Sequence, residues 1–341
     1  MFALVHPHLK TQCGNYATAA RGRSPPSPAA RLARRCKTSH TSFPMTSSIQ
    51  LVDGRGGLPE VHIQNDAARA EISLMGAHVL SYQPVGEAEV LFLSAQSNYS
   101  QTGPAIRGGV PVCWPWFGPA NRDALPNATT SHGFARQMMW ELTDRREVSP
   151  RRTEVTLTLR DTPESLAIWP HRFELRLTVS VGATLELSLT TTNSDDAPFT
   201  IAQALHTYFA IGDVNTVSVD GFDGLKFIDK APATPPASNP QPGTIRITEE
   251  TDRIYLGHKG RAVISDPAMK RRIVIDKSNS RTSVVWNPWV AKSQRMADFG
   301  DEEFHRMLCV ETCNVADDAV TLAPGASHTL AAAISVCPCE A

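Results

Sequence analysis

HRFELRLTVSVGATLELSLTTTN, residues 171–193, is the stretch of this chain that decides its fold class. Apolar and polar side chains alternate through it in two runs, and Gly182-Ala183 separates them. An alternation with a period of two is typical of a strand with one face on a core, and a two-residue break of this kind predicts a tight hairpin. The preceding stretch TEVTLTLRD, residues 153–161, alternates in the same way. We therefore predict three antiparallel strands that cover one side of a core.

Shorter runs with strand-like patterning are spread over the rest of the chain. They lie at residues 61–65, 68–74, 77–83, 89–94, 199–209, 215–220, 244–248, 261–265, 271–276, 282–286, 306–312 and 328–336. No segment has a long helical period, and Gly and Pro punctuate the runs. Many short strands of this kind predict an all-β protein, specifically a large antiparallel β-sandwich.

A proline-rich run, APATPPASNPQPG at residues 231–243, interrupts this pattern without ending it. Five prolines in such a run predict an extended or flexible loop, and an interdomain linker is the alternative. Because strand patterning continues unchanged on both sides, we predict a single domain over residues 47–341.

The N-terminal arm differs from the rest of the chain in its charge. Residues 1–52 contain seven Lys and Arg and no Asp or Glu, and they are rich in Ser, Thr, Ala and Pro. Since the whole chain has a net charge of −1, the remainder carries −8. A basic, acid-free, Ser-rich start predicts an organellar transit peptide over residues 1–46, and its composition favours the chloroplast over the mitochondrion. The alternatives are an unstructured tail, with a shorter cytoplasmic form beginning at Met45, and a nucleic-acid-binding arm, which the acidic body disfavours.

The cysteines do not follow a metal-binding or disulfide pattern. There are seven, an odd number, and neither Cys309 with Cys313 nor Cys337 with Cys339 has a partner motif. We therefore predict free thiols in a reducing compartment and no structural metal. No apolar run approaches the length of a membrane span, so we expect no membrane partner.

One long loop is predicted from Ile106 to Arg136, because Gly and Pro recur through it together with Trp114 and Trp116. Long ordered loops usually carry function. Two arginines, Arg107 and Arg136, lie near its ends, and guanidinium groups bind phosphate through paired hydrogen bonds. The loop therefore suits a ligand with an apolar face and an anionic tail. The alternative is a surface loop pinned by its tryptophans, with both arginines solvated.

His206 and Glu311 each interrupt an apolar, strand-like run. A buried carboxylate is costly unless it is paired or protonated. Together the two residues would supply a general acid and a general base with pKa values that burial moves toward neutrality. The alternatives are a core histidine and a structural ion pair. A second segment, residues 284–304, mixes aromatic and charged side chains and is predicted to line a pocket. Asp252 precedes a predicted strand, and its spacing alone indicates a solvated loop acid.

Several motifs occur together and in order: IRGGVPVCWPWFG (106–118), HGFAR (132–136), ALHTYF (204–209), WNPW (286–289), MADFG (296–300) and the VET run (310–312). In this the chain resembles the hexose-6-phosphate mutarotases, a branch of the aldose 1-epimerase superfamily, over about residues 50–336. The resemblance implies the galactose mutarotase-like β-sandwich, also called a supersandwich.

By this resemblance, His206 matches the catalytic acid and Glu311 the catalytic base. The resemblance also places Arg107 and Arg136 at the substrate phosphate. The further substrate-binding residues that it implies are Asp252, Ser131 and His132. Relatives often have Gln at the position of Ser131, so this contact departs from the family pattern.

The implied activity is the interconversion of the α and β anomers of a hexose 6-phosphate, with glucose 6-phosphate as the first choice. It needs proton transfer and no metal or organic cofactor. We expect a monomer whose partner is a small sugar phosphate rather than a nucleic acid. Two other functions stay open: a mutarotase for unphosphorylated aldoses, which two buried cations disfavour, and a non-catalytic sugar-phosphate sensor, which would not need a matched acid and base.

Overall fold

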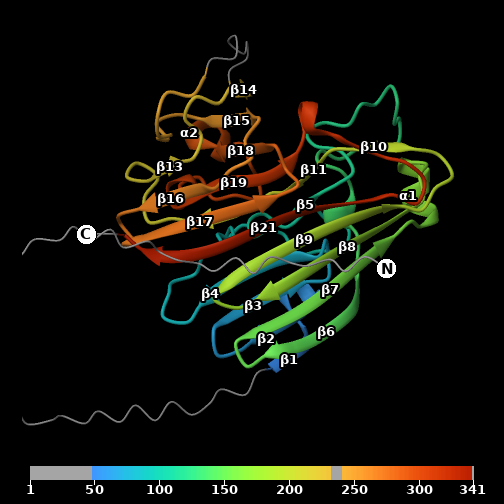
Figure 1. Cartoon of the computed structure of the whole chain (residues 1–341), viewed down its shortest axis with the longest axis horizontal. Helices are drawn as coiled ribbons and strands as arrows, with labels where there is room; N and C mark the ends of the chain where they lie inside the picture. Colours follow the sequence, from blue (N-terminus) through green and yellow to red (C-terminus); the bar gives the residue numbers. More distant parts are fainter. Residues whose placement is uncertain (1–47, 232–239, 340–341) are drawn as a thin grey trace, which may run out of the picture. The chain divides into compact units, whose positions relative to one another are not determined.

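The computed structural model describes residues 48–231 and 240–339, which form mostly antiparallel β-structure (Figure 1). An eight-stranded sheet has the order β13-β16-β17-β21-β9-β8-β7-β6. Its strands are β13 (Ser218–Asp220), β16 (Ala262–Asp266), β17 (Arg271–Ser278), β21 (Ser327–Pro338), β9 (Thr184–Asn193), β8 (Phe173–Val181), β7 (Arg152–Arg160) and β6 (Glu141–Ser149).

A seven-stranded sheet has the order β14-β15-β18-β19-β11-β5, with β12 also paired to β19. Its strands are β14 (Phe227–Asp229), β15 (Thr251–Leu256), β18 (Thr282–Asn287), β19 (Met307–Asn314), β11 (Gln203–Leu205), β5 (Val112–Cys113) and β12 (Tyr208–Ala210). The side chains of the candidate site come mainly from this sheet and its adjoining loops.

Two smaller sheets complete the β-structure. One contains β1 (Ser48–Asp53), β2 (Pro59–Gln64), β3 (Ala68–Ser73) and β4 (His78–Pro84); the other pairs β10 (Phe199–Ile201) with β20 (Val320–Leu322). The helices of the described residues are short: α1 (Pro163–Ile168), α2 (Trp289–Ser293) and 3-10 turns at Arg55–Gly57, Ala135–Gln137, Glu303–Arg306 and Ala316–Asp318.

The alternating stretch of the sequence forms the predicted hairpin of β8 and β9 in the interior of the eight-stranded sheet, between β21 and β7 (Figure 1). On β8 the buried apolar side chains are Phe173, Leu175, Leu177, Val179 and Val181, and on β9 they are Leu185, Leu187 and Leu189. Gly182 and Ala183 form the turn, where the Gly182 amide donates to the Thr184 carbonyl at 3.2 Å. One continuous buried cluster takes side chains from the four-, seven- and eight-stranded sheets, so these sheets share a single core.

Several predicted strands differ from the observed ones. The run 199–209 is divided into β10, β11 and β12, because the chain changes partners: β10 pairs with β20, whereas β11 and β12 pair with β19. The runs 89–94 and 244–248 form only isolated bridges, such as Leu91 to Phe209 and Ile245 to Val219.

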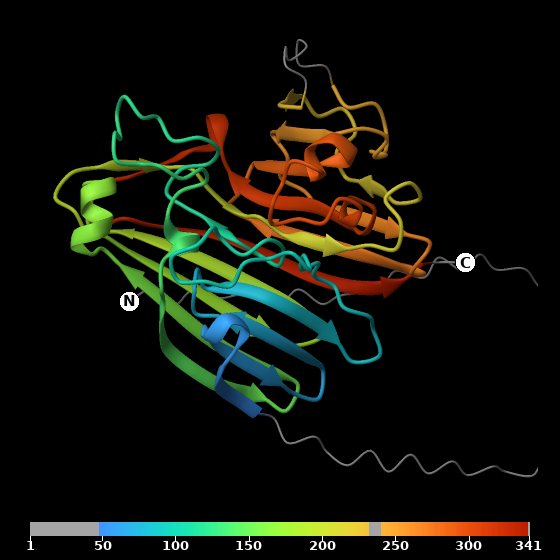
Figure 2. The ribbon, with the colours of Figure 1, turned by 180° about the vertical axis from the view of Figure 1, so that it is seen from behind.

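The predicted loop 106–136 contains the short strand β5, reaches into the 3-10 turn Ala135–Gln137 and is otherwise irregular, as Figure 2 shows for the chain between β5 and β6. All described elements belong to one compact unit, Pro44–Ala341. The predicted transit peptide 1–46, its boundary with the domain at residue 47, and residues 232–239 of the proline-rich run lie outside the described residues.

Candidate active site

The seven predicted site residues line two cavities. The first, of about 410 Å³, is lined by Arg107, His132, His206, Asp252 and Glu311, and we call it the acid–base cavity. The second, of about 200 Å³, is lined by Arg107, Ser131 and Arg136, and we call it the arginine cavity. Arg107 and Tyr208 line both cavities, so the two are neighbours with a shared wall.

The acid–base cavity contains the pair that the sequence predicts. Glu311 lies in the middle of β19, opposite Val284 of β18, and is 1% exposed. His206 lies in the two-residue break between β11 and β12, and not within one continuous strand as predicted. Its backbone amide donates to the Pro111 carbonyl at 3.1 Å. The two side chains meet with 3.3 Å between His206 Nε2 and Glu311 Oε1, which is close enough to pass or share a proton.

Burial sets the protonation of this pair. Loss of water, and then the nearby Asp252, raises the pKa of Glu311 well above its ordinary value. Loss of water lowers the pKa of His206 well below its ordinary value, and His132, Arg136 and Arg107 act in the same direction. Burial therefore favours the pair with its shared proton on Glu311 and with a neutral His206.

His132 is a second neutral imidazole in this cavity. Its ring centroid is 5.8 Å from that of His206. Burial, followed by the charges of Arg136 and Arg107, lowers the pKa of His132 to about 3. Its Nδ1 accepts from the Gly118 amide at 3.3 Å, so the hydrogen of the neutral ring lies on Nε2, which is left as a donor.

The backbone around His132 explains the glycine that follows it. Gly133 has a φ of 73°, and a Cβ there would lie 1.8 Å from the Trp114 carbonyl oxygen. Only glycine permits both the left-handed conformation and this close approach. The glycine of the HGFAR motif thus holds the His132 loop against the chain near β5.

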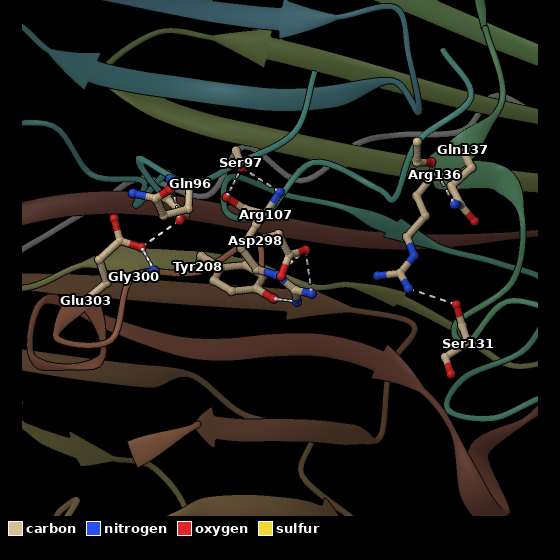
Figure 3. Close-up of polar contacts among 12 residues, drawn as sticks. Gln96, Ser97, Arg107, Ser131, Arg136, Gln137, Tyr208, Asp298, Gly300 and Glu303 are labelled. Carbon is tan, nitrogen blue, oxygen red and sulfur yellow. Dashed lines mark hydrogen bonds and ion pairs between the residues drawn. The ribbon is translucent and has the colours of Figure 1, made fainter. Parts of the chain in front are cut away.

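The arginine cavity holds its two guanidinium groups differently (Figure 3). Arg107 donates through Nε and Nη2 to Asp298 Oδ2, at 3.2 and 3.0 Å, and through Nη1 to the Tyr208 hydroxyl at 3.0 Å. Arg136 donates through Nη2 to the Ser131 carbonyl at 2.8 Å. Its buried Nε has no hydrogen-bond partner among the described residues. A buried donor of this kind is costly unless a ligand satisfies it.

Asp252 lies within β15 and not before a strand, so its interpretation as a solvated loop acid is wrong. Its side chain is 27% exposed, with 3.7 Å between its Oδ2 and Lys292 Nζ. Burial raises the pKa of Asp252, while Lys292 and Lys230 oppose that change. Because all three side chains line the acid–base cavity, they offer both hydrogen-bond donors and an acceptor for ligand hydroxyl groups.

Comparison with known proteins assigns the chain to a family. The sequence profile described as aldose 1-epimerase matches residues 59–335. The chain belongs to the aldose 1-epimerase family. A protein of Escherichia coli K12, provisionally named glucose-6-phosphate 1-epimerase, is 38% identical over 274 residues, which are 80% of this chain and 89% of that protein. A protein of Cenchrus ciliaris with the same provisional name is 37% identical over 300 residues, 85% of this chain and 88% of that one.

Solved structures agree with this assignment. The crystal structure of a protein of Salmonella typhimurium, provisionally named a mutarotase, superposes with a TM-score of 0.76 at 35% identity, covering 86% of this chain and 94% of that one. The galactose 1-epimerase of Lactobacillus acidophilus has a TM-score of 0.65 at 14% identity and shares the fold. The predicted all-β class and the predicted resemblance are both confirmed.

The sequence did not single out every residue that lines the two cavities of this aldose 1-epimerase family member. Tyr208, Gln137 and Lys230 line the two cavities without having been predicted. Of these three residues, only Tyr208 could have been found from the sequence, because it follows the predicted site residue His206 by two positions. Lys292 and Asp298 come from the segment 284–304 that was predicted to line a pocket, and both line one.

The remaining predictions concern thiols, metals and membranes. The five cysteines of residues 48–231 and 240–339 are free, and Cys113, Cys309 and Cys313 are buried. The one described group with metal-ligand spacing is Glu60, His62 and Glu71, and Arg55 already donates to both of its carboxylates, at 3.0 and 2.7 Å. Within the part of the chain that the structure describes, the helices are too short or too polar to cross a membrane.

Proposed function

We propose that this protein interconverts the α and β anomers of a hexose 6-phosphate, with glucose 6-phosphate as the first candidate. The observation that carries this proposal is the buried pair of His206 and Glu311, 3.3 Å apart, in a cavity that shares Arg107 with the arginine cavity. The names of the Escherichia coli and Cenchrus ciliaris relatives support the same substrate.

The reaction requires two proton transfers and no net change of charge on the pair. With Glu311 as carboxylate and His206 as imidazolium, Glu311 takes the proton of the O1 hydroxyl while His206 protonates the ring oxygen. The C1–ring oxygen bond breaks and the C1 carbonyl forms. Rotation about C1–C2 presents the other face of the carbonyl, and closure returns both protons. General acid–base catalysis of this kind contributes about 10²–10⁴-fold.

The protonation state that burial favours corresponds to one stage of this cycle. After ring opening, Glu311 carries a proton and His206 is neutral. The raised pKa of Glu311 and the lowered pKa of His206 favour the same distribution in the free protein. In ring opening the pair gives one proton to the ring oxygen and takes another from the O1 hydroxyl, so it holds one proton before and after the step.

The shape and lining of the two cavities fit a phosphorylated sugar. Pockets of about 300–1,000 Å³ bind small ligands, and the acid–base cavity, with a volume of about 410 Å³, lies in this range. Trp286 offers an apolar face there and Asp252 a hydroxyl acceptor. The unpartnered Nε of Arg136 suits a phosphate oxygen in the neighbouring arginine cavity. Binding energy from that remote group would orient the ring.

Two alternatives predict different results. A mutarotase for unphosphorylated aldoses would leave the Nε of Arg136 without a ligand. A sugar-phosphate sensor would use the arginine cavity but would not need an acid and a base 3.3 Å apart. Substrate preference separates the first alternative from our proposal, and catalysis separates the second.

The test is the anomerisation rate of freshly dissolved α-glucose 6-phosphate, coupled to a dehydrogenase that accepts only the β anomer. Wild type is compared with Glu311→Gln and with Glu141→Gln, which changes a glutamate that is 72% exposed. Glucose and galactose serve as unphosphorylated sugars. We expect wild type and Glu141→Gln to accelerate the phosphorylated sugar selectively, and Glu311→Gln to lose the acceleration. Equal acceleration of the neutral sugars would favour the first alternative, and binding without acceleration the second.

The finer expectations about partners and location are part of this proposal. We propose that the protein acts as a monomer without nucleic acid, and that residues 1–46 direct it to the chloroplast. Light scattering during gel filtration tests the first point, and imaging of residues 1–60 fused to a fluorescent protein tests the second. A dimeric mass, or fluorescence confined to the cytoplasm or to mitochondria, would contradict them.

A further inference from the structure

Tyr208 lies between the two cavities and contacts the central group of each. It is the first residue of β12 and is 2% exposed. Its ring stacks on the His206 ring, with 4.9 Å between centroids and 12° between planes. Trp286 packs against both rings at steep angles, 73° to Tyr208 and 78° to His206. The position of the His206 imidazole is therefore set by two aromatic neighbours, one of them parallel to it.

The Tyr208 hydroxyl belongs to the arginine cavity. It accepts from Arg107 Nη1 at 3.0 Å, on the side of the guanidinium away from the bonds to Asp298 (Figure 3). Burial raises the pKa of Tyr208, so the phenol keeps its hydrogen. Within residues 48–231 and 240–339 that hydrogen has no hydrogen-bond acceptor, and the residue lines the arginine cavity. The hydroxyl can thus donate to an anion there while it accepts from Arg107.

The groups around Arg107 are fixed before any ligand arrives. The Arg107 amide donates to Ser97 Oγ and the Arg107 carbonyl accepts from it, both at 2.8 Å. Glu303 accepts from Ser94 Oγ at 2.6 Å and from the Gly300 amide at 2.8 Å. It therefore ties the loop that ends near Ser97 to the loop that carries Asp298 (Figure 3). Arg107 is thus held through its backbone by Ser97 and through its guanidinium by Asp298. It therefore gives Tyr208 a fixed hydrogen-bond donor.

We propose that Tyr208 is a specificity-determining and positioning residue: its hydroxyl, together with Arg107, recognises the phosphate, and its ring holds His206 in the orientation for proton transfer. This rests on the proposed function, because the phosphate and the proton transfer belong to the same substrate. The hydroxyl and the ring of Tyr208 have separate roles, so substitutions can remove the hydroxyl alone or the hydroxyl together with the ring.

Tyr208→Phe removes the hydroxyl and keeps the ring. We expect the KM for glucose 6-phosphate to rise about tenfold, the value for one hydrogen bond to a charged group, and kcat to stay within about twofold. Tyr208→Leu also removes the ring, and we expect kcat to fall by a further tenfold or more. Tyr82→Phe is the matched control, because it removes another buried tyrosine hydroxyl, one that donates to the Gly182 carbonyl at 2.9 Å.

A binding measurement keeps the test independent of catalysis. Calorimetry with 1,5-anhydroglucitol 6-phosphate, which has no anomeric hydroxyl and cannot react, should show about tenfold weaker binding to Tyr208→Phe and unchanged binding to Tyr82→Phe. Loss of this affinity in a protein that anomerises no sugar would reject the proposed function while retaining the phosphate role of Tyr208. Unchanged affinity and KM in Tyr208→Phe would overturn the inference, and so would a fall in kcat as large as the rise in KM.

Circular dichroism melting of all three variants separates a structural effect from a functional one. Each is expected to be folded at the assay temperature. If Tyr208→Leu does not fold, the result for Tyr208→Phe alone decides the role of the hydroxyl, and Tyr208→Met, which removes the flat ring and keeps a long apolar side chain, replaces it as the test of stacking. Wild-type kcat with glucose 6-phosphate in whichever of Tyr208→Leu and Tyr208→Met folds would contradict the positioning role.

Discussion

The surroundings favour neutral side chains in the acid–base cavity and a charged side chain in the neighbouring arginine cavity. In the acid–base cavity, burial favours the neutral forms of Glu311, His206 and His132. In the arginine cavity, Tyr208 and Asp298 raise the pKa of Arg107 against the effect of burial, so its charge is retained. Proton transfer needs groups that are easily charged and discharged, whereas anion binding needs a charge that is always present. The difference shows how one site can both bind and react.

The largest effect on activity should follow from removing an ionisable side chain of the acid–base cavity. We expect His206→Asn to lower kcat with glucose 6-phosphate by about 10²–10⁴-fold, because it removes the group that we propose to protonate the ring oxygen. KM should change by less than about threefold, since the phosphate contacts remain. His171→Asn is the control, as that imidazole pairs with Asp195 at 3.1 Å and lines neither cavity. A rise in KM with unchanged kcat would place His206 in binding and not in catalysis.

The next largest effect on activity should follow from removing a guanidinium group of the arginine cavity. We expect Arg136→Ala to lower kcat/KM for glucose 6-phosphate by about 10–100-fold, since losing one charge-assisted contact costs about 1.5–3 kcal/mol. Rates with any unphosphorylated sugar should not change. Arg122→Ala, in the same loop but exposed, is the control for a general loss of positive charge. Equal losses in the two arginine variants would show that the effect is long-range electrostatics and not a specific contact.

The sequence predicted the eight-stranded sheet better than the site. The alternation of β8 and β9 is local, and each apolar residue reports directly on the face that it buries. At one edge of this sheet, β6 was missed because its residues are nearly all exposed and carry no apolar face. An edge strand needs only one hydrogen-bonded neighbour, and charged side chains protect it from further pairing.

The site depends on contacts between distant parts of the chain. His206 and Glu311 meet because β12 pairs with β19 in a register that places Tyr208 opposite Cys309, and local patterning cannot fix such a register. Their identities were predicted from two polar residues in apolar runs and from family resemblance. Asp252 was misplaced because β15 is only partly buried and its polar and apolar residues do not alternate. Asp298 was found only as part of a segment, since its partner Arg107 is 191 residues away.

A smaller effect should come from Asp298, the ion-pair partner of Arg107. Arg107→Ala leaves the Asp298 carboxylate without its ion pair, beside the position that we propose for the phosphate. Part of the fall in kcat/KM of this variant should therefore come from repulsion between the two anions and not from the missing contact. We therefore expect Arg107→Ala/Asp298→Asn to recover about tenfold in kcat/KM for glucose 6-phosphate relative to Arg107→Ala alone. Asp298→Asn by itself should lower kcat/KM, because Arg107 is then less well held. If the double variant is no better than the single one, Asp298 does not face the phosphate.

The smallest effect concerns stability in the absence of substrate. The folded pKa of Glu311 lies above its unfolded value, so the native state binds more protons than the unfolded one between those two values, and its stability falls as pH rises through that window. Glu311→Gln cannot ionise. We expect it to be as stable as wild type near pH 4 and to gain on wild type by about 1.4 kcal/mol for each pH unit between the unfolded and the folded pKa of Glu311. Both proteins contain His206, so its opposite dependence on pH largely cancels from their difference.

Urea unfolding of the two proteins and of Glu141→Gln across this range measures the effect. A gain that is equal at every pH would mean that the stabilisation comes from packing and not from the buried carboxylate, and acid–base function would then carry no cost in stability.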